Sequence, residues 1–85
     1  MISLSNKPDN YPTNKDRADW ARDAVEGFIS MVGGDDLKTS ISDLIANILH
    51  LCDEENINHE DVFRNATWHY EEEVLIQKEW DEEEG

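Results

Sequence analysis

Residues 37–52, LKTSISDLIANILHLC, hold the clearest periodic pattern in the chain. Apolar side chains recur there every three or four positions, which is the spacing that lines one face of an α-helix. The stripe consists of Leu37, Ile41, Leu44, Ile45, Ile48, Leu49 and Cys52, and Leu51 widens it. We therefore expect a helix that begins at Asp35 or Asp36 and forms the central, most buried element of the fold.

A second helix is expected before this stretch. Thr13 or Asn14 can cap its N-terminus, because short polar side chains accept hydrogen bonds from the free N–H groups of a first turn. Gly33 and Gly34 follow the last apolar residue, and glycine is the usual residue in the left-handed position that ends a helix. The apolar stripe of this helix comprises Trp20, Ala21, Ala24, Val25, Phe28, Ile29 and Val32.

A third helix is expected after Asn56, which suits a left-handed cap of the central helix. Asn58 and Asp61 resemble a capping box, because an acid follows the capping side chain after three residues. The stripe of the third helix comprises Val62, Phe63, Ala66, Tyr70 and Val74. Three further apolar residues fall off this stripe, namely Trp68, Leu75 and Ile76. Either the helix is contacted on two sides, or a second chain covers the extra face.

Together these patterns predict an all-α fold, a small antiparallel bundle of three helices with an extended N-terminal lead-in. We assign residues 1–13 to the lead-in, 14–80 to a single helical domain and 81–85 to a frayed acidic tail. The sequence contains no alternating strand pattern of useful length and no nucleotide-binding glycine motif.

The charge of the 85-residue chain is strongly negative, with a formal net value of −14. Residues 1–52 carry eight acidic and five basic side chains, whereas residues 53–85 carry thirteen acidic and two basic ones. Such a field repels nucleic acids and anionic membranes, and it favours a basic protein partner. The alternative is that the acidity serves solubility alone.

The sequence also bears on the cellular location of the protein. Its first residues, MISLSNKPDNYP, lack an apolar segment of signal-peptide length, and no run of residues approaches the length of a membrane span. We therefore expect a cytoplasmic protein. The single cysteine, Cys52, excludes an internal disulfide, and its apolar neighbours indicate a small buried hydrophobe.

Residues 40–73, SISDLIANILHLCDEENINHEDVFRNATWHYEEE, carry a resemblance. They resemble a group of short, acidic bacterial and phage-type hypothetical proteins, in which a helix of the form DLxxxLxHLCD is followed by a turn and a second helix ending in HYEEE. The matching residues are Asp43, Leu44, Leu49, His50, Cys52, Asp53, Phe63, Ala66, His69, Tyr70 and Glu73. The resemblance implies an all-helical fold and a microbial or phage origin, and it implies no chemistry.

Two histidine–glutamate pairs are candidates for metal binding. His50 and Glu54, like His69 and Glu73, are four residues apart and therefore share a helix face. If the second and third helices pack antiparallel, Asp43, His50, His69 and Glu73 could form one site for a divalent metal, the one cofactor considered for a hydrolase-like alternative function. The competing interpretation is that each pair lies on the surface and stabilises its helix slightly.

The off-stripe residues of the third helix are the candidates for partner binding. They are Trp68, Glu71, Glu72, Leu75, Ile76 and Trp80. An exposed tryptophan among acids indicates a surface that a partner covers, because interface hot spots favour tryptophan. The alternative for Trp68 is that it packs on the first helix or on the lead-in segment. We expect a non-enzymatic module that binds a basic protein surface. The most specific version of this hypothesis is a DNA mimic, whose carboxylates occupy a nucleic-acid-binding groove. A homodimer that uses the same apolar residues is compatible with this hypothesis.

Overall fold

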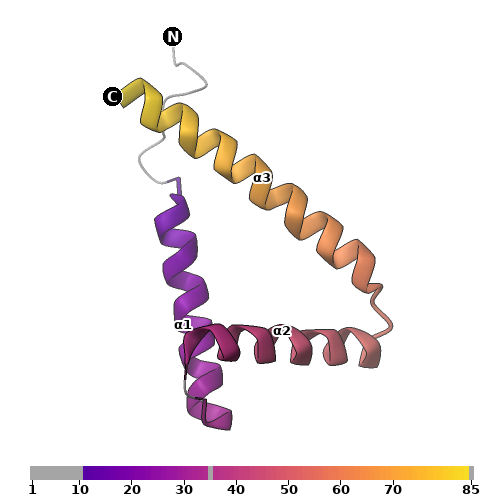
Figure 1. The fold of residues 1–85 in the computed structure, drawn as a ribbon. Helices are drawn as coiled ribbons and strands as arrows, with labels where there is room; N and C mark the ends of the chain where they lie inside the picture. Colours follow the sequence, from indigo (N-terminus) through magenta and orange to yellow (C-terminus); the bar gives the residue numbers. More distant parts are fainter. Residues whose placement is uncertain (1–10, 35, 85) are drawn as a thin grey trace.

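The structure, a computed structural model, describes residues 11–34 and 36–84. Three α-helices, α1 (Asn14–Val32), α2 (Leu37–Glu54) and α3 (His59–Glu84), make up almost all of this part of the chain (Figure 1). These described residues contain no strand, and the predicted all-α class with three helices is confirmed. Residues 81–84, expected to be frayed, continue α3, whereas the expected lead-in at residues 1–10 lies outside the described residues.

Capping side chains set the ends of α1. The Thr13 hydroxyl accepts a hydrogen bond from the Asp16 N–H (3.1 Å), and the Asp16 carboxylate accepts one from the Thr13 N–H (2.9 Å). This reciprocal pair satisfies two of the donors that every helix start leaves free. At the other end Gly33 adopts φ 75°, and its N–H donates to the Ile29 carbonyl. The predicted start and end of the first helix are both confirmed.

The turn between α2 and α3 is a Schellman motif followed at once by a new cap. Asn56 adopts φ 58°, and the N–H groups of Asn56 and Ile57 donate to the carbonyls of Asp53 and Cys52. The Asn58 side chain then accepts a hydrogen bond from the Asp61 N–H (3.0 Å) and starts α3. The left-handed role of Asn56 and the capping role of Asn58 are confirmed.

The three helices form an open triangle (Figure 1). The N-terminal part of α2 crosses α1, and α2 and α3 then diverge from the turn that joins them. The C-terminal part of α3 returns to the N-terminus of α1, which closes the third corner. The helices therefore meet near their ends and do not pack along their lengths.

Polar and aromatic contacts hold the corner between α1 and α3. The Trp80 side chain is 4% exposed and packs edge-to-face on Tyr11, with ring centroids 5.4 Å apart. The Arg17 guanidinium pairs with the Glu73 carboxylate (3.1 Å) and also lies over the Tyr11 ring. Asn14 adds two hydrogen bonds to α3, one of which runs from its side chain to the Glu73 carbonyl.

The openness of the triangle leaves little buried surface. Among the described residues, the buried apolar side chains are those of Val25, Cys52 and Trp80. The Cα radius of gyration is 16.4 Å, whereas a compact domain of this length has one of about 12 Å. None of the described helices is long and apolar enough to cross a membrane.

The apolar stripe of α2, expected to be the most buried surface of the fold, is largely exposed, although Ser40 and Cys52 of this helix are buried. Ile45 is 42% exposed, and the other isoleucines of the α2 stripe are exposed to a similar degree. The physical reason is the crossing geometry, since α1 covers the start of α2 and α3 reaches its end. Trp20, assigned to the stripe of the first helix, is likewise 60% exposed.

Candidate interaction surface on the last helix

One side of α3 presents two large apolar residues to solvent. The Trp68 side chain is 59% exposed and the Leu75 side chain 61% exposed. Their spacing of seven residues corresponds to two helical turns, so both lie on the same face. Helical spacing places these two side chains roughly opposite Glu73, which pairs with Arg17 of α1. We call this side, with its neighbouring acids, the outer face of α3.

Carboxylates surround these two apolar side chains. Glu71 and Glu72 follow Trp68 by three and four residues, which makes them its neighbours on the helix surface. Glu79 and Glu82 follow Leu75 by four and seven residues and share its side of the helix, and the exposed Lys78 follows Leu75 by three. The outer face therefore consists of Trp68, Glu71, Glu72, Leu75, Glu79 and Glu82, all of them exposed. The local potential is negative, and the apolar centre is Trp68.

A shallow hollow lies beside Trp68 on the flank of α3. It has a volume of about 410 Å³ and is lined by Phe63, Arg64, Thr67, Trp68 and Glu71. The Arg64 guanidinium is engaged by the Asp61 carboxylate one turn earlier, which partly neutralises it. The Trp68 ring contacts His69 edge-to-face at 5.1 Å, so its position is supported from one side. A partner side chain could rest in this hollow against the Trp68 ring.

Two residues expected in this surface lie elsewhere. Trp80 is buried against Tyr11 at the corner with α1, which corrects the expectation that it contacts a partner. Ile76 is half-buried on the flank of α3 and lies away from Trp68 on the helix surface. The other four predicted residues, Trp68, Glu71, Glu72 and Leu75, are exposed together on the outer face.

The predicted metal site does not assemble. Asp43 and His50 are exposed on the side of α2 opposite its apolar stripe, whereas Glu73 pairs with Arg17 at the α1 corner. His69 lies on α3 beside Trp68. Among the described residues, no group of three or more histidine, cysteine, aspartate or glutamate side chains is placed to hold a metal ion. The reason is that α2 and α3 diverge, so their His–Glu faces do not meet.

The sequence pattern did not predict the contact that His59 makes across the turn between α2 and α3. His59, the first residue of α3, lies with Nε2 at 2.7 Å from the Asp53 carboxylate and 3.2 Å from the Leu49 carbonyl of α2. A protonated Nε2 donates to both oxygens, which ties the start of α3 to the end of α2. The spacing of six residues across a turn has no helical periodicity, so the pattern gave no signal for this contact.

Comparison with known proteins adds no relative. No family model, curated protein or solved structure matches the chain.

Proposed function

We propose that this chain is a small, non-enzymatic interaction protein that binds a basic surface of another protein through the outer face of α3. The observation that supports the proposal is the pairing of Trp68 with Leu75 at the centre of an acidic helix face. Exposed tryptophan is a frequent hot spot of protein interfaces. Carboxylates around it would steer a basic partner and set its orientation. The cytoplasmic location and the microbial or phage origin stay predictions.

The chemistry of the partner follows from this arrangement. A helix or loop that carries lysine and arginine around one or two aliphatic side chains complements the outer face in both charge and polarity. The aliphatic group would contact Trp68 near the hollow on the α3 flank. The basic groups would pair with Glu71, Glu72 and Glu79. Because these carboxylates are exposed, each pair contributes little affinity but a strong salt dependence.

A defined probe tests the proposal. The probe is a synthetic amphipathic helical peptide rich in lysine, arginine and leucine, and its binding is measured by calorimetry. We expect the affinity to fall by about tenfold or more between low and moderate salt. The substitution Trp68→Ala should weaken binding by about tenfold or more, because it removes the apolar centre.

Trp20 provides a matched control for this experiment. It is a tryptophan of nearly the same exposure, 60%, but it lies on α1 away from the outer face. The Trp20→Ala variant should therefore keep the wild-type affinity for the peptide. Equal losses in the two variants, or an affinity that does not respond to salt, would contradict the proposal.

A further inference from the structure

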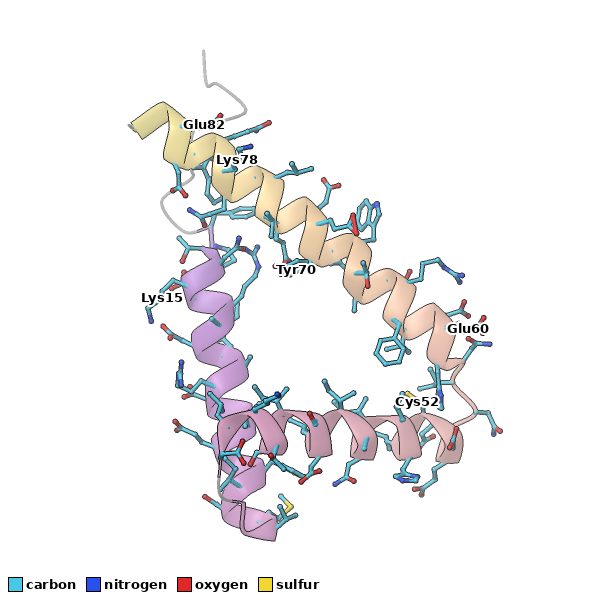
Figure 2. All side chains as sticks on the ribbon, viewed as in Figure 1. Lys15, Cys52, Glu60, Tyr70, Lys78 and Glu82 are labelled. Carbon is cyan, nitrogen blue, oxygen red and sulfur yellow. The ribbon has the colours of Figure 1, made fainter. Side chains whose placement is uncertain are left out.

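A second exposed surface lies on the inner side of the triangle. Figure 2 shows Cys52 of α2 and Tyr70 of α3 pointing into the space that the three helices surround. Helical spacing places the α2 stripe on the side of Cys52, and it places Phe63 and Val74 on the side of Tyr70. We define the inner face as Leu37, Ile41, Ile45 and Ile48 of α2 with Phe63, Tyr70 and Val74 of α3, all of them exposed.

We propose that this inner face is the interface with a second copy of the chain. The first argument is surface area. The structure exposes 7046 Å², whereas a compact monomer of this mass exposes about 5,200 Å². The excess over the whole chain is about 1,800 Å², and a stable dimer buries about 800 Å² on each partner. Less than half of the excess is enough for such an interface.

The second argument is the small core of the single chain. Three buried apolar side chains in the described part of the molecule give little of the apolar burial that stabilises an ordinary domain. A chain this short therefore needs its exposed stripe covered whenever it is folded. A second copy is available wherever the chain is made, so it can cover this stripe permanently.

The third argument is charge. The apolar stripe of α2 carries no ionised side chain, since Asp43, Asp53 and Glu54 lie away from it and Lys38 lies at its edge. On the inward side of α3, Glu73 is neutralised by Arg17 of the same chain. Asp81, two turns after Val74 and also on this side of α3, accepts a hydrogen bond from Gln77 and lies beside Lys78. The residues of the inner face itself carry no carboxylate, so two inner faces can meet through them while the acidic outer faces remain at the periphery. Symmetric contact of one patch with itself is the usual geometry of homodimers.

Sedimentation of the full chain with one pair of variants tests this inference. The wild-type chain should sediment with twice its 9.8 kDa mass at micromolar concentrations. Ile45→Glu places a carboxylate in the centre of the inner face and should weaken dimerisation by about a hundredfold or more. The control is Ala46→Glu, because Ala46 is the next residue on α2, is exposed, and lies off the stripe. It adds the same charge and should leave the dimer intact.

Folding is followed in the same samples by circular dichroism. Ile45 is already 42% exposed, so the helices of a single chain can accommodate the glutamate there. If the Ile45→Glu variant unfolds, the urea denaturation of the wild-type chain tests the dimer instead. A urea midpoint that rises with protein concentration supports a dimer coupled to folding. A monomeric wild type, a concentration-independent midpoint, or equal effects of the two glutamates would overturn the inference. The inference does not rest on the proposed function, because the inner face shares only Phe63 with the hollow beside Trp68 and Ile45 lies on a different helix.

Discussion

Gly33 sits at the end of α1 in the left-handed region, where side chains other than glycine are strained. A Cβ atom at this position would meet no neighbouring atom, so the cost of Gly33→Ala comes from the backbone alone. We expect the free energy of unfolding, measured in urea, to fall by about 1 kcal/mol.

Gly27 is the matched control for that substitution. It lies inside α1, and a Cβ atom there also meets open space. Gly27→Ala should raise the free energy of unfolding by about 0.5–1 kcal/mol, because alanine loses less backbone entropy in a helix. A loss of stability in Gly27→Ala, or no loss in Gly33→Ala, would contradict the left-handed cap at Gly33.

Asp36 caps α2, and this contact makes one end of the helix sensitive to acid. The hydrogen bond from the Thr39 N–H holds the pKa of the Asp36 carboxyl below its ordinary value of 3.8. A group with a lowered folded pKa contributes stability that is complete above its unfolded pKa and is lost as the pH falls through the folded pKa. The contribution of Asp36 is therefore complete at neutral pH, begins to fall below about pH 4, and is lost once the pH is below the lowered pKa of the folded chain.

A carboxyl-carbon NMR titration checks this behaviour. The Asp36 midpoint should lie lower in the folded chain than in the chain unfolded by urea, and the Thr39 amide signal should move with it. In Asp36→Asn, which retains a capping oxygen but does not titrate, the Thr39 signal should stay constant over that range. Identical midpoints for Asp36 in the folded and unfolded chains would refute the capping interaction.

At the scale of elements, α3 carries two tryptophans with opposite environments. Trp80 is buried at the α1 corner and Trp68 is exposed on the outer face. Trp80→Ala should lower the free energy of unfolding by about 3 kcal/mol, because it opens the contact with Tyr11. Trp68→Ala should change it by no more than about 0.5 kcal/mol. Urea denaturation distinguishes the two, and similar losses would mean that α3 is not attached through Trp80.

The elements themselves were predictable from the sequence because their ends are encoded locally. Thr13, Gly33 and Asn58 act within three or four residues of their own positions, and each residue type has a distinct backbone preference. Trp80 was not predictable in this way. Its partner Tyr11 is 69 positions away, and helical periodicity says nothing about which distant side chain meets a given face.

At the scale of the whole molecule, a helical stripe shows which face is apolar but not what covers it. The α2 stripe was expected to be covered by the other two helices, yet the triangle leaves Ile41, Ile45 and Ile48 exposed. The same divergence separates the His50 and His69 faces, so the predicted metal site required a packing that the fold does not adopt. The acidic surface was easier to predict, because charge and exposure follow from local sequence. Four of its six expected residues lie together on α3.

The two surfaces have different chemistry and lie on different sides of α3, adjoining only at the hollow that Phe63 and Trp68 both line. The inner face is apolar and self-complementary, whereas the outer face is acidic with Trp68 at its centre. Variants in one should therefore leave the other intact, provided that the fold is kept. If the chain binds a basic partner as proposed, the position of the carboxylates on α3, and not the net charge of −14, determines the affinity.

The most direct measurement compares two variants with identical net charge. Glu71→Gln/Glu72→Gln removes two carboxylates beside Trp68, and Asp43→Asn/Glu54→Gln removes two exposed carboxylates from α2. Calorimetry with the basic peptide at low salt should show about a tenfold loss of affinity for the α3 pair and little change for the α2 pair. Equal losses in both variants would mean that the peptide responds only to total charge, which contradicts binding at the outer face of α3.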